Sequence, residues 1–354
     1  MATIQELGFA VGVHGRGARN HIVDVSGGLG VAQRSFRDAK AGVCTGFTVI
    51  QVGSRLNQRC AAGLFALNGS GELTNSHTIR EWGFLDTPIV LTNTPSVGRA
   101  YDGVSEWMMK RLPAIGESES VVIPVVGECD DSVCHDPRAR VWGSKELESA
   151  LDEALLVAEG KAQPSLEALA QGDVGGGTGM TTFELKSGIG SASRKIHCGK
   201  QEYIVGVLLQ TNFGVREQLT VLGHNIGPVL SQPKPRIHRE GSCVGILATD
   251  APLSPLGLER LAKRMGLGLA RAGSHAHHGS GEIFLAVSTA SESRHALEWD
   301  GAEWNPLLQA AVEASEEAVY NSLLCARAVD NSRASVAALK AEDVPGADAA
   351  VEPC

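Results

Sequence analysis

The stretch GSCVGILATDAPLSP, residues 241–255, sets a glycine and a serine in front of an apolar run and a helix start. SCVGILATD (242–250) has the continuous apolar character of a buried strand. Ser254 and Pro255 fit an N-cap followed by proline at the first helical position. The predicted helix ends near Gly273, and one of its faces carries Leu258, Leu261, Met265 and Leu269. A buried strand that leads into an amphipathic helix predicts a protein with both α and β structure.

Segments on both sides of this stretch extend the mixed pattern. YIVGVLLQTNFG (203–214) and EIFLAVST (282–289) are typical of buried strands. Apolar residues at helical spacing predict a helix from about 145 to 159 and a last helix that starts at Asn305. These strands and helices do not alternate as they do in a Rossmann fold.

Three other regions complete the sequence pattern. Residues 1–125 alternate short apolar runs with turn residues, which predicts a β-rich segment. GDVGGGTGM (172–180) is rich in glycine but lacks the lysine of a phosphate-binding P-loop, which argues against nucleotide binding. From about residue 332 onward there is little to bury, which predicts a frayed tail.

Composition excludes several classes of function. The 354 residues include 31 Lys and Arg against 40 Asp and Glu, a formal charge of −9, which is unfavourable for binding nucleic acid or an anionic membrane. The apolar segments are too short to span a bilayer, and the N-terminus lacks the pattern of a secretory signal. We therefore expect a cytoplasmic protein whose eight scattered cysteines are reduced thiols.

Two clusters contain metal-binding residue types: Cys129, Cys134 and His135 in one, and His275, His277 and His278 in the other. The first has no second half elsewhere in the chain, as a zinc site would require. The second lies in a predicted loop with no carboxylate pattern beside it. Both patterns favour ordinary side chains over a metal site.

An ordered series of segments carries a family resemblance. In chain order they include NHIVDVSGGLGV (20–31), AGLFALNGSGELTNSHTIREWGFLDTPIVLTNTPSVG (62–98), VVGE (125–128), GDVGGGTGM (172–180), ELKSGIGSASR (184–194), LLQTNFG (208–214), GSCVGILATDAPLSP (241–255), SGEIFLAVST (280–289) and NPLLQAAVEASEEAVYN (305–321). The series resembles the self-processing serine aminopeptidases, which include the L-aminopeptidase/D-amidase-esterase and the β-aminopeptidases.

The resemblance implies a fold and a processing event. The fold is a four-layer αββα sandwich similar to ornithine acetyltransferase, with chemistry like that of N-terminal-nucleophile hydrolases. It would form one catalytic domain over residues 1–330, and the polar composition beyond it predicts a flexible tail over 331–354. The precursor would cut itself between Gly241 and Ser242, leaving an α chain (1–241) and a β chain (242–354).

Ser242 would then be both the nucleophile and the new N-terminal residue. A serine hydroxyl is a weak nucleophile until a base takes its proton. The α-amine of Ser242 has an unperturbed pKa of about 7.7–8.0, close to the pH at which a general base must work. Gly241 suits this step because a side chain there would crowd the attack on its carbonyl. The preceding segment QPKPRIHREG (232–241) is typical of an exposed linker.

Three further residues match catalytic positions of the family. Ser280 and Glu282 are expected to hydrogen-bond the new amine and Ser242, and alternation along a strand would put both on one face. Asn212 matches the asparagine that donates to the substrate's carbonyl oxygen.

The resemblance also implies substrate-binding residues, and this chain departs from the family pattern at one of those positions. Glu128 matches an acidic residue near the free amine of the substrate, where a carboxylate would enforce removal of N-terminal residues. Asp130 stands where relatives often carry Tyr or Trp, so we expect it to point elsewhere or to bind a cationic substrate. Gly176, Gly177 and Thr178 of the glycine-rich stretch are expected beside the site.

The leading hypothesis is an autoprocessed aminopeptidase that acts on small peptides, amides or esters with a free amine, through an acyl-enzyme on Ser242. The resemblance implies no cofactor or metal, and a homo-oligomer, often a tetramer of αβ units. Two alternatives stay open. An amine could replace water and give aminoacyl transfer, or the chain could be an unprocessed homologue that serves as a binding protein.

Overall fold

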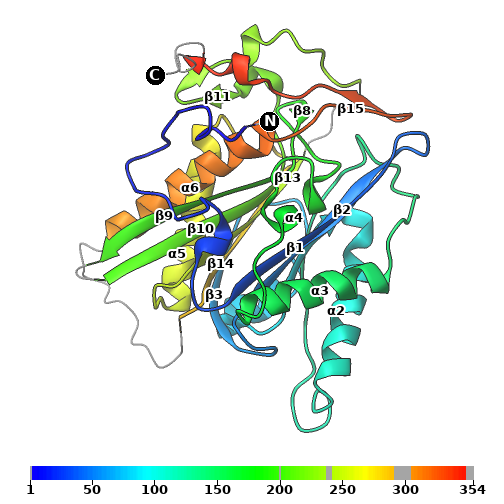
Figure 1. Ribbon diagram of the computed structural model, residues 1–354, viewed down its shortest axis with the longest axis vertical. Helices are drawn as coiled ribbons and strands as arrows, with labels where there is room; N and C mark the ends of the chain where they lie inside the picture. Colours follow the sequence, from blue (N-terminus) through cyan, green and yellow to red (C-terminus); the bar gives the residue numbers. More distant parts are fainter. Residues whose placement is uncertain (1, 199–200, 237–240, 291–303, 348–354) are drawn as a thin grey trace.

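The protein is described by a computed structural model that covers residues 2–198, 201–236, 241–290 and 304–347. Two large sheets form its centre (Figure 1). The first has four strands in the order β1 (Leu29–Asp38), β2 (Val43–Val52), β5 (Ile89–Asn93) and β6 (Val125–Cys129). The second has six, in the order β4 (Phe84–Leu85), β3 (Cys60–Gly69), β14 (Gly281–Ser288), β13 (Ser242–Thr249), β10 (Gln201–Asn212) and β9 (Ile189–Cys198).

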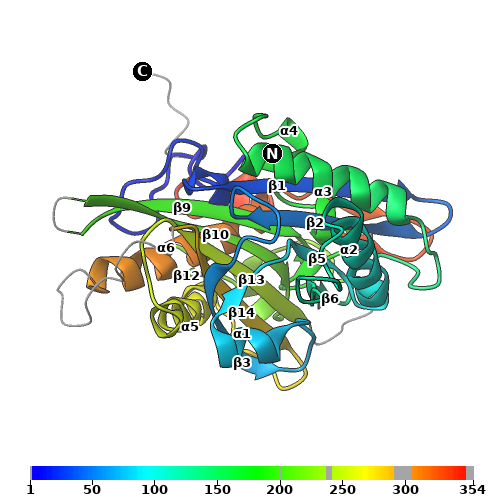
Figure 2. The same ribbon diagram turned by 90° about the horizontal axis from the view of Figure 1, so that it is seen from below.

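Helices cover the outer faces of both sheets. The helices α2 (Val97–Arg111) and α3 (Ser144–Ala158) share one apolar core with the four-stranded sheet. On the other side, α5 (Pro255–Arg271) and α6 (Trp304–Leu324) share another with the six-stranded sheet, and the inner faces of the sheets form a third core between them. Figure 2 shows α3 and α5 on opposite sides of the sheets. The four-layer αββα sandwich expected from the resemblance is confirmed.

Short elements connect these layers. The short helices are α1 (Ser76–Trp82) and α4 (Leu166–Leu169), and the short strands include β7 (Thr181–Thr182), β8 (Leu185–Lys186), β11 (Thr220–Val221) and β12 (His224–Asn225). Among the described residues, no helix combines the length and apolar character needed to cross a membrane.

All three predicted helices are present. The helix expected over about 145–159 is α3, and the last predicted helix is α6. The N-cap of α5 is also as predicted, because the Ser254 hydroxyl accepts a hydrogen bond from the Gly257 backbone N–H at 3.2 Å. Strong helical spacing and capping residues decided these elements locally.

Residues 1–125 are β-rich as predicted, since β1 to β5 lie within them, but the prediction missed the short helix α1 and the longer helix α2. This helix buries Ala100, Val104, Trp107 and Met108 against the four-stranded sheet. Their spacing is helical, but the glycines and polar residues around them have the composition of turns.

The expected tail is wrong for residues 331–347, which are folded onto the domain. The strands β15 (Val329–Asp330) and β16 (Ser335–Val336) pair as a hairpin. Val336, Leu339 and Val344 are buried in the core clusters. A few well-spaced apolar side chains are enough to hold this segment, although its overall composition is polar. Residues 348–354 of the expected tail lie outside the described residues.

The strand β13 lies near the middle of the six-stranded sheet. It runs parallel to β14 and antiparallel to β10. Its first residue, Ser242, therefore lies beside the end of β10 and the start of β14, which brings three distant parts of the sequence together.

Candidate functional site

Ser242 lies at the first position of β13 and is 5 % exposed. The strand register pairs it with Asn212 on β10 and with Gly281 on β14. The structure therefore brings Ser242 together with Asn212 and with the segment that contains Ser280 and Glu282. The hydrogen bonds from Ser280 and Glu282 to Ser242 that the resemblance implies stay a prediction.

The bond before Ser242 is held closely by its neighbours. The backbone N–H of Gly281 donates a hydrogen bond to the carbonyl oxygen of Gly241 at 3.2 Å. A Cβ atom on Gly241 would lie 1.5 Å from the carbonyl oxygen of Asn212, so only glycine fits here without a backbone shift. The Asn212 backbone therefore requires glycine at this position, while the predicted crowding of the attack on the Gly241 carbonyl stays a prediction.

Ser280 and Glu282 form a buried pair. The Ser280 hydroxyl donates a hydrogen bond to Oε1 of Glu282, whose other oxygen, Oε2, is buried and has no hydrogen-bond partner among the described residues. Burial raises the pKa of Glu282 above its usual value, and the Ser280 hydrogen bond opposes that shift. A buried carboxylate oxygen without a partner is costly, so it marks a place where a donor is expected.

The pair does not share a face of the sheet with the Ser242 side chain. Paired residues of neighbouring strands point the same way, and the register matches Glu282 with Cys243 and Ser242 with Gly281. Cys243 belongs to the core on the α5 and α6 side of the sheet. Ser280 and Glu282 thus lie across the strand from the Ser242 hydroxyl, at the strand end that carries the Ser242 nitrogen.

The turn that carries Ser280 is fixed by a residue that the sequence reasoning did not single out. The side-chain amide of Asn68, on β3, donates to the carbonyl oxygens of Ser280, His277 and His278 at 2.6, 2.8 and 3.2 Å. Asn68 lies within a segment that carried the family resemblance, but no local spacing distinguishes it from an ordinary turn asparagine.

The side chain of Asn212 has a fixed orientation. Its Oδ1 accepts a hydrogen bond from the backbone N–H of Thr181 at 3.0 Å, and its Nδ2 donates one to the carbonyl oxygen of Asp130 at 2.9 Å. The amide nitrogen carries two hydrogens, so one N–H remains available to a further acceptor. This is the donor capacity that the predicted role of Asn212 requires.

The thiol of Cys129 is the neighbour of the Ser242 hydroxyl that the sequence reasoning missed. It lies at the end of β6, within hydrogen-bonding reach of that hydroxyl. It also donates to the carbonyl oxygen of Gln210, with 3.6 Å between sulfur and oxygen. Burial raises the pKa of Cys129 to about 12, so the thiol is protonated near neutral pH.

Glu128 precedes that thiol and is 7 % exposed. One carboxylate oxygen accepts from the Glu72 backbone N–H at 3.0 Å, and the other accepts from the Thr94 hydroxyl. Burial raises the pKa of Glu128, whereas these two hydrogen bonds lower it. A Cβ placed on Gly71 would lie 3.3 Å from Oε1, so a glycine keeps the space beside the carboxylate open.

The side chain of Asp130 is engaged with its own turn. Its two oxygens accept from the backbone N–H and the hydroxyl of Ser132 at 2.8 and 2.9 Å. The carboxylate thus caps a local turn, while the Asp130 carbonyl oxygen holds Asn212. This agrees with the expectation that its side chain points elsewhere.

The next residue, Asp131, is more deeply buried. Asn93 Nδ2 donates to both of its carboxylate oxygens at 3.0 Å. Burial raises the pKa of Asp131 to about 7, which makes it a titratable group inside the loop that holds Asn212.

Gly176, Gly177 and Thr178 are packed inside the protein. A Cβ on Gly176 would lie 2.0 Å from Oε1 of Gln210, and one on Gly177 would lie 2.3 Å from the backbone nitrogen of Ile189. The Thr178 hydroxyl donates to the Gly175 carbonyl oxygen at 2.7 Å. The glycines are explained by close backbone approach, and a direct contact of these three residues with substrate stays a prediction.

The two candidate metal clusters are dispersed among other contacts. Cys134 lies in a small apolar cluster with Cys44, and Nδ1 of His135 accepts from the Cys44 backbone N–H at 3.3 Å. The rings of His275 and His277 contact opposite ends of the Gln218 side-chain amide. Within the part of the chain that the structure describes, no three His, Cys, Asp or Glu side chains are grouped to hold a metal ion.

Comparison with known proteins gives a consistent match along the chain. The model of peptidase family S58 matches residues 20–337. The beta-peptidyl aminopeptidase BapA of Sphingosinicella xenopeptidilytica is 34 % identical over 307 residues, which are 79 % of this chain and 73 % of that relative.

Solved structures show the same similarity. A beta-aminopeptidase from Burkholderia sp. is 34 % identical, with a TM-score of 0.86 and coverage of 100 % of both chains. An L-aminopeptidase D-Ala-esterase/amidase from Ochrobactrum anthropi is 30 % identical, with a TM-score of 0.84 and coverage of 97 % of both chains. The latter is described as a prototype of the serine aminopeptidases and a new variant among the Ntn-hydrolase folds, and the present chain has that fold.

Proposed function

The chain belongs to peptidase family S58 and is a hydrolase of the serine aminopeptidase type, and from this premise we propose that it cuts itself between Gly241 and Ser242. Ser242 then becomes the N-terminal nucleophile that removes the first residue of small peptides, amides or esters. The observation that supports this most directly is the hydrogen bond from the Gly281 N–H to the Gly241 carbonyl oxygen.

Self-cleavage begins with attack of the Ser242 hydroxyl oxygen on the Gly241 carbonyl carbon. Negative charge develops on the Gly241 oxygen, where the Gly281 N–H already donates. The C–N bond then breaks, the proton from the hydroxyl ends on the Ser242 nitrogen, and an ester remains. Water hydrolyses this ester, which frees the carboxyl group of Gly241 and both the amine and the hydroxyl of Ser242.

The mature site uses the amine that self-cleavage produces. This amine takes the hydroxyl proton while the oxygen attacks the substrate carbonyl, and water later hydrolyses the acyl-enzyme. The unpartnered Oε2 of Glu282 is suited to accept a hydrogen bond from the ammonium that forms. The position of Glu282 across the strand from the hydroxyl favours the nitrogen as its partner.

Recognition of the substrate amine is assigned to Glu128. A carboxylate has about four acceptor sites, so the contacts with Glu72 and Thr94 leave capacity for a substrate ammonium. Pairing of this kind favours substrates that end in a free amine next to the reacting carbonyl. Since two of the similar proteins are named as β-aminopeptidases, substrates that begin with a β-amino acid belong in the tests.

A paired substrate panel tests this function. Purified enzyme is given p-nitroanilides of β-alanine, D-alanine and L-leucine, each with a free and with an acetylated amine. We expect hydrolysis of at least one free-amine substrate, none of its acetylated partner, and no activity in Ser242→Ala. Equal rates with free and acetylated substrates would contradict recognition of the amine.

The variant Glu128→Gln isolates the proposed ion pair. It should lower kcat/KM for the free-amine substrate by roughly 10- to 100-fold, as loss of a charge-assisted hydrogen bond does. Glu72→Gln is the matched control, because it removes an exposed neighbouring charge that raises the pKa of Glu128 but keeps the backbone N–H that donates to Glu128. An equal loss of kcat/KM in both variants would contradict the assignment of amine recognition to Glu128.

A further inference from the structure

A buried loop connects the two sheets to the oxyanion donor of the proposed site. We call residues 173–181 the glycine loop; it contains the buried run Gly175–Gly177 and ends at Thr181. The Thr181 backbone N–H donates to Oδ1 of Asn212 at 3.0 Å. The position of the loop therefore bears directly on the orientation of the Asn212 amide.

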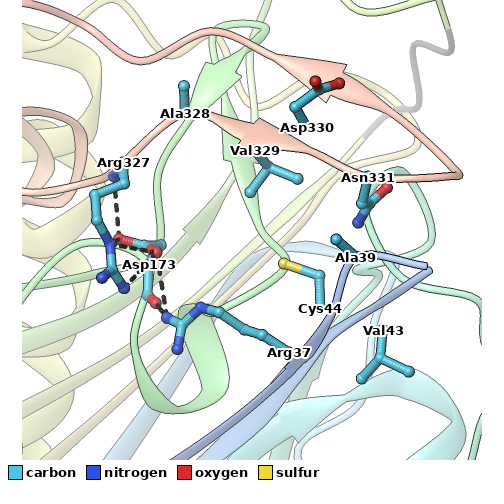
Figure 3. A pocket seen from close by; sticks show the side chains of 10 residues that line it. All are labelled: Arg37, Ala39, Val43, Cys44, Asp173, Arg327, Ala328, Val329, Asp330 and Asn331. Carbon is cyan, nitrogen blue, oxygen red and sulfur yellow. Dashed lines mark hydrogen bonds and ion pairs between the residues drawn. The ribbon is translucent and has the colours of Figure 1, made fainter. Parts of the chain in front are cut away.

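The first end of the glycine loop is fixed by two arginines. Asp173 Oδ2 accepts from Arg327 Nη2 at 3.0 Å and from Arg37 Nη2 at 3.2 Å, while the Arg327 backbone N–H donates to Oδ1 at 3.0 Å. Figure 3 shows Asp173 between the two guanidinium groups, at the side of a cavity of about 200 Å³. These contacts tie the loop to β1 and to the segment after α6.

The other end is fixed by Lys186, whose side chain is completely buried. Its Nζ donates to the carbonyl oxygens of Ser187, Met180 and Gly177 at 2.6, 2.7 and 3.4 Å. All three donors of an ammonium are thereby used. A protein in which an apolar side chain of similar size replaces a buried charge is often equally stable. Stability alone therefore does not explain why a lysine that donates three hydrogen bonds stands here.

The contacts of Lys186 lead to Asn212 in two steps. Met180 accepts from Lys186 and is followed by Thr181, whose N–H holds Asn212 Oδ1. Thr181 and Lys186 are also paired across the β7–β8 ladder. With its oxygen fixed, the Asn212 amide presents its nitrogen to Asp130 and to the Ser242 end of the sheet. A flipped amide would present an acceptor there and could not stabilise an oxyanion.

We propose that Lys186 is a positioning residue for Asn212, and that it sets the orientation of the amide by holding the carbonyls of Gly177 and Met180. The inference rests on the proposed function, because it matters only if the Asn212 amide donates to the reacting carbonyl oxygen. In that case Lys186 contributes to catalysis only by orienting Asn212, so its replacement should lower kcat only when Asn212 is present.

A double-mutant cycle tests this dependence. Lys186→Met and Asn212→Ala are made singly and together, and self-cleavage rate and kcat per cleaved chain are measured for each. Loss of an oxyanion donor typically costs about 10²–10³ in kcat. We expect Lys186→Met to lower kcat by a similar factor, with KM changed much less, and to cause no further loss when Asn212 is already alanine.

Arg194→Met is the matched control. Arg194 is equally buried, but it pairs with Glu313 and Glu317 on α6. Its replacement should lower the melting temperature and change kcat by the same factor in both Asn212 backgrounds. Lys186→Gln, which retains two N–H donors, should recover part of the kcat that Lys186→Met loses.

Each outcome has a distinct meaning. If Lys186→Met lowers kcat by the same factor with and without Asn212, or leaves kcat unchanged, the inference is wrong. Failure of both Lys186 variants to fold, with Arg194→Met folded, would assign Lys186 to stability alone and would also overturn it. If Asn212→Ala itself has no effect on kcat, the assumed role of Asn212 fails instead.

Discussion

The backbone N–H of Gly281 lies 3.2 Å from the carbonyl oxygen of Gly241 and donates a hydrogen bond to it. This contact joins the bond before the nucleophile to the residue between Ser280 and Glu282. Glycine at both positions lets the strands approach this closely. A Cβ on Gly281, for example, would lie only 2.2 Å from the Ser70 carbonyl oxygen. The contact gives the uncut chain a backbone donor at the oxygen on which charge would develop.

Gly241→Ala tests the close fit at this bond. The new Cβ would overlap the Asn212 carbonyl oxygen, so the backbone must shift. Displacement of a reacting group by about 1 Å can cost about 10²-fold in rate, and we expect self-cleavage to slow by about that factor. Intact-mass measurements over time give the rate. Gly69→Ala is the control, because within the described part of the chain its Cβ would have no neighbour closer than 4 Å; equal slowing in both variants would contradict the explanation.

Glu282→Gln tests the unpartnered carboxylate oxygen. Glutamine can still accept from the Ser280 hydroxyl, but an N–H₂ group replaces the oxygen that we assign to the Ser242 ammonium. Positioned acid–base groups contribute about 10²–10⁴-fold, so kcat per cleaved chain should fall by about 10²-fold or more. The loss should come with an altered pH profile of kcat. A variant with unchanged kcat and profile would show that Glu282 does not serve the amine.

Thiol reagents test which side chain is the nucleophile, since Cys129 lies next to Ser242. Burial keeps the pKa of Cys129 at about 12, and the thiolate is the reactive form. We therefore expect iodoacetamide at pH 8 to leave Cys129 unmodified in the folded enzyme, with activity retained, whereas unfolded protein is alkylated there. Peptide mapping measures the modification. Loss of activity in step with alkylation of Cys129 would point to the thiol instead.

Asp131→Asn tests the buried carboxyl group of the loop that holds Asn212. The folded-state pKa of about 7 is above the ordinary value of 3.8, so between these values the unfolded chain ionises and the folded chain does not. The group therefore lowers stability as pH rises from about 4 to 7, by up to about 1.4 kcal/mol per pH unit.

Urea unfolding of wild type and Asp131→Asn at several pH values measures this effect. The free energy of unfolding of the variant minus that of wild type should increase as pH rises from about 4 to 7 and should stay constant above that range. A difference that does not change with pH would show that Asp131 ionises with an ordinary pKa.

Local patterns in the sequence predicted much of the fold. Helices α3 and α5 follow from apolar spacing and from the Ser254 cap, and the start of β13 at Ser242 follows from an apolar run behind a linker. Helix α2 was missed because its apolar positions stand among residues typical of turns. The folded segment over 331–347 was missed because a few buried side chains outweigh a polar composition.

Sequence reasoning named several residues that the structure brings together, but it did not predict their geometry. Alternation correctly placed Ser280 and Glu282 together, but only the pairing of β13 with β14 shows that they lie across the strand from the Ser242 hydroxyl. The Gly281 N–H is a backbone group, and Lys186 acts through carbonyl oxygens. Contacts of these kinds depend on how distant segments meet, which local residue spacing does not reveal.

Intact-mass spectrometry of wild type and Ser242→Ala tests the central claim most directly. Ser288→Ala is the control, because Ser288 is a buried serine at the opposite end of β14. We expect wild type and the control to give two fragments, the smaller beginning at Ser242, and Ser242→Ala to remain one chain of 37.1 kDa. An active wild-type protein that stays uncut, or a Ser242→Ala protein cut at the same bond, would contradict the proposed mechanism.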